Sequence, residues 1–194
     1  MKSFTVKGWD LERFEPEYVR SRIQEASKHG INTISLSHEI VHNAEEILFD
    51  WHRYKHLNNF CEEAHRYGMR VFLWNAQINN PPEHLISTAE APGHFYLNFD
   101  HPDLLSWLYD RYQRVVERVP NIDGIILGLT EGEWQIHRWP EDPYYYNMQK
   151  RKTLSDLPPD ERIARVVGTV YESLSSKGKN LLVRDFLRTP AEMD

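Results

Sequence analysis

The sequence predicts an α/β protein built around a parallel sheet. Segments with the apolar spacing of amphipathic helices alternate with short β-rich runs, and a helix stop marks the junction of each pair. A helical crossover is what lets consecutive strands run the same way. Two architectures fit this alternation: an incomplete (β/α)8 barrel of the TIM-barrel type, with about five βα units, or a five-stranded doubly wound parallel sheet.

Five strands are expected, each of them a short run rich in β-branched and other apolar residues. Each strand after the first follows almost directly on the helix before it. The segments that lead from a strand to the next helix are long, namely 37–51, 76–100 and 130–158. The expected strands are residues 4–8, 31–37, 69–75, 122–129 and 181–186.

Four helices are expected between these strands, and each has a start or stop signal. The first begins at Pro16, whose fixed φ suits the first helical turn, and ends at Gly30. The second lies within residues 53–67, and its apolar face carries Cys61. The third runs from about residue 101 to just before Pro120, and the fourth from near Pro159 to Gly178.

Composition narrows the classes of function. The chain has 194 residues, 40% of them hydrophobic, which is enough for one sizeable core, so residues 1–194 are expected to form a single domain. The formal net charge of −6 makes the chain a poor ligand for nucleic acid. No glycine-rich phosphate-binding motif follows any strand, so no cofactor is expected. A lone cysteine, Cys61, excludes an internal disulfide.

The sequence shows no sign of a membrane partner. Its first residues carry charges every few positions and lack the apolar run of a signal peptide. No window approaches the roughly 20 apolar residues that span a bilayer. These observations favour a soluble protein with a cytoplasmic location.

The polar and aromatic residues at the strand ends predict a carbohydrate site. The carboxyl ends of parallel strands meet at one edge of a sheet, where α/β enzymes build their sites. Indole rings there would offer flat surfaces to the apolar faces of sugars, and polar groups would bind the hydroxyls. The residues expected to bind substrate are Trp9, His38, Trp74, Asn75, Glu133, Trp134, Arg184 and Asp185.

Glu131 is the strongest catalytic candidate. It follows a nearly all-apolar strand and lies in a segment with Trp134, surroundings that disfavour a charged carboxylate and suit a general acid. Hydrolysis of a glycosidic bond needs such an acid and a second carboxylate as base or nucleophile. Glu133, two residues further on, is a poor second partner because two groups from one strand end seldom lie on both sides of the scissile bond.

One motif suggests a different chemistry. Residues 38–42 read H-E-x-x-H, which on a helix would place His38 and His42 on a zinc ion with Glu39 as the base. The motif follows a β-rich run and lies outside any helical apolar pattern. For this reason the favoured interpretation of His38 and His42 is hydrogen bonding, with no metal. A zinc-dependent hydrolase is kept as the alternative.

The sequence motifs around the fourth expected strand resemble those of a known family. Residues 120–124, Pro-Asn-Ile-Asp-Gly, lead to Thr-Glu-Gly at 130–132, and residues 99–102 and 183–186 read Phe-Asp-His-Pro and Val-Arg-Asp-Phe. These segments are similar to motifs of the α-glucuronidases, glycoside hydrolase family 67, over most of the chain. The resemblance implies that Glu131 is the catalytic acid and that Arg184 contacts substrate. Leu127 stands where the family has a lysine that contacts the sugar carboxylate.

The resemblance also implies a partial (β/α) barrel that lacks three of eight strands. In that family the carboxylates that act as catalytic base lie on those later strands. The 194-residue chain is therefore expected to be inactive alone, and the complete form is expected to be active as a glycosidase. Unpaired sheet edges in a partial barrel favour self-association. A non-catalytic carbohydrate-binding fragment is the alternative function.

Overall fold

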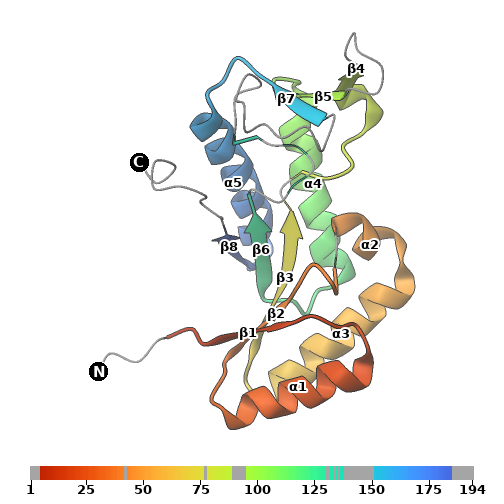
Figure 1. Cartoon of the computed structure of the whole chain (residues 1–194), viewed down its shortest axis with the longest axis vertical. Helices are drawn as coiled ribbons and strands as arrows, with labels where there is room; N and C mark the ends of the chain where they lie inside the picture. Colours follow the sequence, from red (N-terminus) through yellow and green to blue (C-terminus); the bar gives the residue numbers. More distant parts are fainter. Residues whose placement is uncertain are drawn as a thin grey trace.

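The main sheet of the protein is a row of five parallel strands, seen in a computed structural model (Figure 1). The structure describes residues 5–41, 43–76, 78–88, 95–129, 132, 134, 136–137 and 151–184. Within these residues the strands lie in the order β1-β2-β3-β6-β8. Their bounds are Gly8–Leu11 for β1, Thr33–Leu36 for β2, Arg70–Ala76 for β3, Gly124–Gly128 for β6 and Asn180–Arg184 for β8.

The strand order decides between the two expected architectures. Each strand pairs in parallel with the next strand of the same sheet along the chain, from β1 to β8. A doubly wound sheet reverses direction partway, which places helices on both faces. Here the order never reverses, and right-handed crossovers then place every helix on the same face. The protein is therefore an incomplete (β/α) barrel.

Helices fill the crossovers with the expected signals at their ends. They are α1 (Pro16–Lys28), α2 (Ala44–Phe49), α3 (Trp51–Arg66), α4 (Asp103–Arg118) and α5 (Pro159–Ser175). Gly30, Gly68 and Gly178 follow α1, α3 and α5 with φ of 67°, 70° and 69°, the left-handed conformation that ends a helix without steric penalty. The short helix α2 was not expected, and the side chain of Asn43 caps it by accepting from the Glu46 N–H.

The first strand lies further along the chain than the sequence pattern predicts. Strand β1 is Gly8–Leu11 and not residues 4–8, of which residue 4 lies outside the described part. Leu11 is fully buried beneath the helices, and burial of this side chain fixes the alternation of the strand. Trp9 and Asp10 consequently lie inside the strand instead of after it.

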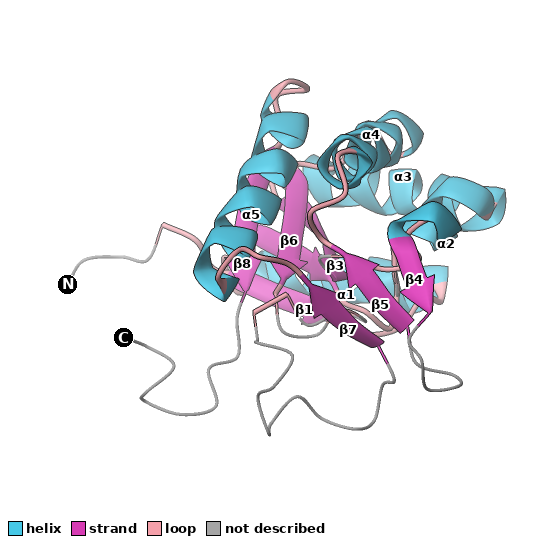
Figure 2. Cartoon of the chain, turned by 90° about the horizontal axis from the view of Figure 1, so that it is seen from above, coloured by secondary structure: helices cyan, strands magenta, loops and turns pink. Residues whose placement is uncertain are grey.

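A second, smaller sheet joins two of the long connections. Strands β4 (Ile86–Thr88) and β5 (Phe95–Asn98) belong to the connection from β3 to α4, which also contains the 3₁₀ turn Glu83–Leu85. Strand β7 (Arg151–Leu154) belongs to the connection from β6 to α5 and pairs with β5 in parallel (Figure 2). This sheet was not predicted, because its strands are only three or four residues long and pair between different connections.

The two connections are also joined by side chains. Asp100 accepts hydrogen bonds from the Ser155 hydroxyl at 2.6 Å and from the Asp156 N–H at 2.7 Å. The Phe99 N–H donates to the Leu154 carbonyl at 2.9 Å. These hydrogen bonds continue the contact between the two long connections past the ends of β5 and β7.

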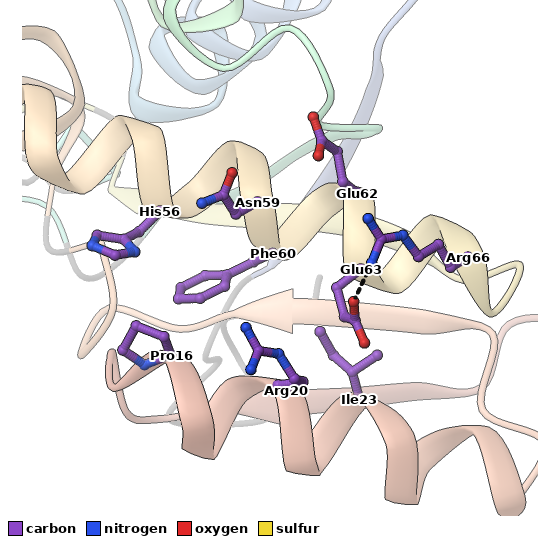
Figure 3. Close-up of a pocket in the computed structure, with 9 residues that line it drawn as sticks. All are labelled: Pro16, Arg20, Ile23, His56, Asn59, Phe60, Glu62, Glu63 and Arg66. Atoms are coloured by element: carbon purple, nitrogen blue, oxygen red, sulfur yellow. Dashed lines mark hydrogen bonds and ion pairs between the residues drawn. The ribbon is translucent and has the colours of Figure 1, made fainter.

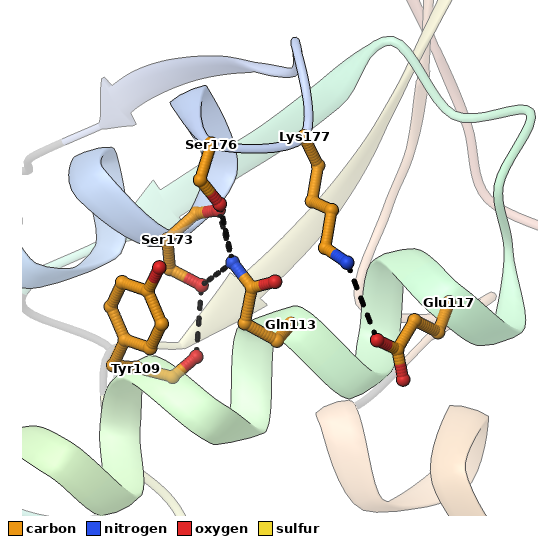
Figure 4. A network of polar contacts seen from close by, with 6 residues as sticks. All are labelled: Tyr109, Gln113, Glu117, Ser173, Ser176 and Lys177. Carbon is orange, nitrogen blue, oxygen red and sulfur yellow. Dashed lines mark hydrogen bonds and ion pairs between the residues drawn. The ribbon is translucent and has the colours of Figure 1, made fainter.

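The hydrophobic core lies between the main sheet and the helices. Its helix layer includes α4 and α5, which pack against each other and bury Leu108 and Val170 in the core. Gln113 of α4 adds polar contacts, donating to the Ser173 carbonyl at 2.6 Å and the Ser176 hydroxyl at 2.7 Å (Figure 4). Among the described residues, no helix combines the length and apolar character needed to cross a membrane.

Candidate functional site

The pairing register sorts the strand residues between two faces of the main sheet. Successive side chains of a strand point to opposite faces. The face toward the helices carries apolar residues that are almost completely buried, among them Ile34, Leu73 and Leu127. Trp74 lies on the opposite face, here called the inner face because it would face the interior of a closed barrel. A site at the strand ends is therefore built from inner-face residues.

His38 and Trp74 meet at the carboxyl ends of β2 and β3. Their ring centroids lie 5.5 Å apart with the ring planes at 64°, an edge-to-face contact. The His38 side chain is half-exposed and its Nε2 lies 3.3 Å from Oε1 of Glu39. The structure therefore brings together two of the residues that the sequence predicted to bind substrate.

Trp74 has a polar atom that its surroundings do not satisfy. The residue is 5% exposed, and its indole Nε1 is buried without a hydrogen-bond acceptor in the part of the chain that the structure describes. A buried donor without an acceptor costs about 1 to 3 kcal/mol relative to a satisfied one. A ligand oxygen that reached this N–H would recover that free energy.

Asn75 lies on the other face of the sheet, which separates it from Trp74. Its side-chain amide is buried and donates to the hydroxyl of Tyr112 on α4 at 3.1 Å. Alternation along β3 is the reason, since neighbouring residues of a strand point in opposite directions. Asn75 therefore does not lie with His38 and Trp74 on the inner face.

Trp9 also lies away from the strand ends. The Arg22 guanidinium sits over its ring at 4.1 Å, and the His29 ring packs against it at 6.4 Å. Arg22 and His29 belong to α1 and its C-terminal cap, so Trp9 packs on the helix-covered face. The prediction placed Trp9 just after a strand at residues 4–8, whereas β1 starts four residues later and contains Trp9.

Trp134 and Arg184 occupy different surroundings. Trp134 is only 1% exposed and belongs to the hydrophobic core, so its ring is not an open stacking surface. Arg184 is the last residue of β8, pairs in register with Gly128 and projects, by alternation, from the inner face.

Glu131, Glu133 and Asp185 lie outside the described residues. Their places in the chain are nevertheless informative. Residues 122–129 were expected to be a strand, and β6 occupies Gly124–Gly128 within that range. Glu131 follows the carboxyl end of β6 by three residues, and Asp185 follows β8 directly.

Residues 38–41, the described part of the H-E-x-x-H segment, do not form a helix. Residues 38–40 form a turn, and the side chains of Ile40 and Val41 are buried in the core. The two histidines of this motif share one face only on a helix, and His42 lies outside the described residues. Over the described part of the chain, no group of three His, Cys, Asp or Glu side chains is placed to hold a metal ion.

Asp10 is an inner-face carboxylate that the sequence-based site omitted. It pairs in register with Ser35 of β2, and alternation places it on the face opposite Leu11. Its side chain is exposed. The apolar pair Trp9 and Leu11, read as alternate residues of one strand, was the signal that could have revealed Asp10.

The amino ends of the same strands carry a different kind of polar cluster. Asp123, just before β6, accepts hydrogen bonds from the Val71 N–H at 2.7 Å and pairs with His65 Nε2 at 2.9 Å. Cys61 lies one helical turn before His65, as expected on the buried face of α3, whereas the His65 side chain is partly exposed. Burial, reinforced by the charge of Asp123, raises the pKa of the Cys61 thiol to about 12.

A cavity of about 290 Å³ lies in the helix layer, between α1 and α3 (Figure 3). Arg20 of α1 and Glu63 of α3 line it from opposite sides, and Phe60 forms part of the wall. Glu63 is already paired with Arg66 of its own helix at 3.0 Å. This cavity is separated from the inner-face residues by the sheet, so it is not part of the strand-end site.

Comparisons with known proteins identify the same fold in glycoside hydrolases. A GH31 dextranase from Flavobacterium johnsoniae, complexed with glucose, matches with a TM-score of 0.63 at 12% identity, over 93% of this chain and 25% of its own. GH5_18 from Bifidobacterium longum matches with a TM-score of 0.56 at 11% identity, over 92% of this chain and 43% of its own. Dispersin B matches with a TM-score of 0.54 at 12% identity, over 92% of this chain and 58% of its own.

The match extends over part of each neighbour. The chain spans about a quarter to three-fifths of the length of these three proteins. No protein-family model matches the sequence, and no curated protein matches it. The likeness therefore establishes a fold shared with TIM-barrel glycoside hydrolases and does not single out family 67.

Proposed function

We propose that this chain is the carbohydrate-binding part of a glycosidase barrel, with Glu131 as the general acid. The observation that carries the proposal is the buried Nε1 of Trp74 at the carboxyl end of β3, which has no hydrogen-bond acceptor among the described residues. Strand β3 pairs directly with β6, and the chain reaches Glu131 three residues after β6 ends. A sugar bound at Trp74 would thus lie beside the strand that leads to the acid.

Each group in the proposed site has a role in binding or chemistry. The Trp74 N–H would donate to a sugar oxygen, and the half-exposed His38 ring would hydrogen-bond a neighbouring hydroxyl. Arg184 would contact the substrate from β8, as the family resemblance implies. Glu131 would protonate the departing glycosidic oxygen, and a second carboxylate would attack the anomeric carbon or activate water.

The described residues favour a neutral sugar over a uronic acid. In family 67 a lysine that contacts the sugar carboxylate stands at the position of Leu127. Here Leu127 is fully buried on the helix-covered face of β6. The proposal therefore keeps the glycosidase chemistry of that family and replaces its acidic sugar by a neutral one.

Catalysis is tested on a longer chain that carries the three further βα units of a complete barrel. Its hydrolysis of aryl glycosides of neutral sugars and of glucuronic acid is measured. Glu131→Gln is expected to lower kcat by about a hundredfold or more, because a general acid contributes at least that factor. Glu172→Gln, on the exposed side of α5, is the matched control and should retain most of the activity. Equal turnover by the wild-type protein and Glu131→Gln would remove Glu131 from the mechanism.

Binding is tested on the 194-residue chain itself by calorimetric titration with isomaltotriose, mannotriose and xylotriose. Trp74→Phe removes the N–H while keeping an aromatic ring, and it should weaken binding about tenfold, the effect of losing one hydrogen bond. Trp9→Phe, on the helix-covered face, should bind as the wild-type chain does. Binding without hydrolysis by the completed barrel would instead support the alternative, a non-catalytic carbohydrate-binding module.

We also propose that the chain associates with itself through its β8 edge. Leu182 and Val183 of this edge strand are exposed, as is Tyr171 of the adjacent α5. An unpaired strand with exposed apolar residues is a template for pairing with another chain. Sedimentation velocity should show dimers that Val183→Lys removes, and a monomeric wild-type chain at all concentrations would contradict this.

A further inference from the structure

The turn between α2 and α3 exposes two aromatic side chains that the fold does not use. Phe49 is 79% exposed, more than any other large apolar side chain of the described residues, and Trp51 is 54% exposed. They flank Asp50 and are here called the aromatic turn. Exposed rings of this size do not stabilise the core, so packing does not explain them.

The backbone of the aromatic turn is held firmly. Asp50 ends α2 and also caps α3, where its Oδ1 accepts from the Arg53 N–H at 3.2 Å. The Arg53 guanidinium pairs with Glu46 of α2 at 3.1 Å and donates to the carbonyl of Ile40. The rings are therefore presented from a fixed turn, which lowers the entropic cost of binding a ligand.

Polar side chains approach the ring of Trp51. The imidazole of His52 packs on the indole, with the ring centroids 3.7 Å apart and an interplanar angle of 35°. The Lys55 ammonium lies 6.0 Å from the indole centroid. More than half of Trp51 stays open to water, beside donors and acceptors that suit hydroxyl groups.

The position of the turn relates it to the strand-end site. Helix α3 leads into the amino end of β3 through Gly68, so its first residue, Trp51, lies toward the carboxyl ends of the strands. The expected substrate site lies at the same end. A carbohydrate chain that occupied this site could extend across the rim of the sheet toward the aromatic turn.

We propose that Phe49 and Trp51 form a second carbohydrate-binding site, which holds a distant part of a polysaccharide substrate. This inference rests on the proposed function. The size of the patch favours sugar over a protein partner: two aromatic side chains cover ~200 Å² each, whereas a stable protein interface needs about 800 Å² on each partner. One or two sugar rings match the smaller area.

Affinity electrophoresis of the 194-residue chain in gels that contain dextran, galactomannan or glucuronoxylan tests the site. At least one polysaccharide should retard the wild-type chain, and the double variant Phe49→Ala/Trp51→Ala should bind it about fivefold more weakly. Tyr67→Ala is the matched control: this ring is 44% exposed at the opposite end of α3, and its loss should change nothing.

Two further measurements separate this inference from the proposed function. Titration with the trisaccharide probes should give the same affinity for the double variant as for the wild-type chain, because these probes would bind at Trp74. Sedimentation velocity should show the same association state for both. Unchanged retardation of the double variant, no retardation of the wild-type chain, or a loss of dimers in the double variant would each overturn the second site, whatever the trisaccharide titration shows.

Discussion

The two ends of the main sheet differ in how their buried polar groups are satisfied. At the amino ends, Asp123 satisfies the Val71 N–H and pairs with His65, while the Asn180 amide donates to the Asp123 carbonyl at 3.1 Å. At the carboxyl ends, Trp74 keeps a buried N–H without an acceptor among the described residues. The polar groups at the amino ends are used by the fold, whereas the Trp74 N–H at the carboxyl ends has no partner among the described residues.

Stability and the proposed sugar binding thus depend on opposite ends of the strands. Three strands, β3, β6 and β8, are tied at their amino ends by one residue, since the Asp123 N–H donates to Val71 and its carbonyl accepts from Asn180. Substitutions there should lower stability without changing affinity for sugar. Substitutions at the carboxyl ends should do the reverse.

Gly124→Ala should be the most damaging change at the amino end. A Cβ at this position would lie 2.2 Å from the Asn180 carbonyl oxygen and 2.7 Å from the Phe72 ring. The backbone of β8 cannot give way without breaking the β6–β8 pairing, so the free energy of unfolding should fall by about 3 kcal/mol. Urea unfolding measures this.

Gly168→Ala is the matched control for that substitution. Gly168 lies inside α5 with nothing within 4 Å of an added Cβ, so alanine should raise the free energy of unfolding by ~1 kcal/mol. If both alanine variants were equally stable, the close approach of β6 and β8 would not be real.

Asp123→Ala should have the next largest effect. It leaves the Val71 N–H without its acceptor and removes the contact with His65, which should lower the free energy of unfolding by about 2 kcal/mol. Asp110→Ala, on the exposed side of α4, should change it by less than about 0.5 kcal/mol. Weakened trisaccharide binding by Asp123→Ala would contradict the division between the two ends.

Cys61 gives the amino end a pH dependence. Its pKa is raised from 9.0 to about 12 by burial, so the folded state keeps the proton over a range in which the unfolded thiol loses it. The contribution to stability is complete below pH 9 and is lost as the pH rises from 9 toward 12. At pH 10 the free energy of unfolding should be lower by about 1 kcal/mol than at pH 8.

The pH effect is checked by urea unfolding at pH 8 and pH 10, with Cys61→Ala as the reference chain. The difference between the two pH values should be smaller in the variant by the amount assigned to the thiol. Iodoacetamide should also modify native Cys61 at pH 8 about a thousandfold more slowly than the unfolded chain, because only the thiolate reacts. Rapid modification of the native chain would show that the thiol is accessible.

The sequence predicted the helices well because their signals are local. Pro16, Gly30 and Gly68 each act within one turn of chain, and the helices begin or end beside them as expected. Strand β1 was misplaced because its register depends on burial of Leu11 beneath the helices, which a short sequence pattern does not encode.

The candidate site was predicted only in part for the same reason. His38 and Trp74 do meet, whereas Asn75 turns to the opposite face and Trp134 packs into the core. Adjacent residues of a strand, such as Trp74 and Asn75, have opposite environments, and a one-residue difference in register exchanges them. The sequence can name the end of a strand, but the face depends on pairing with other strands.

Trp74→Phe should have the smallest effect on stability, and it tests directly whether the Trp74 N–H is satisfied within the folded chain. Phenylalanine keeps an edge-to-face contact with His38 and removes a buried donor that has no acceptor in the described part of the chain, so the free energy of unfolding should stay the same or rise by up to ~1 kcal/mol. Thermal unfolding measures this change, with Trp9→Phe as the control for loss of indole area. A stability loss of several kcal/mol in Trp74→Phe alone would mean that the N–H is satisfied within the folded chain. Trp74 would then belong with Asp123, among residues that serve the fold, and the carboxyl ends would lose their distinguishing feature.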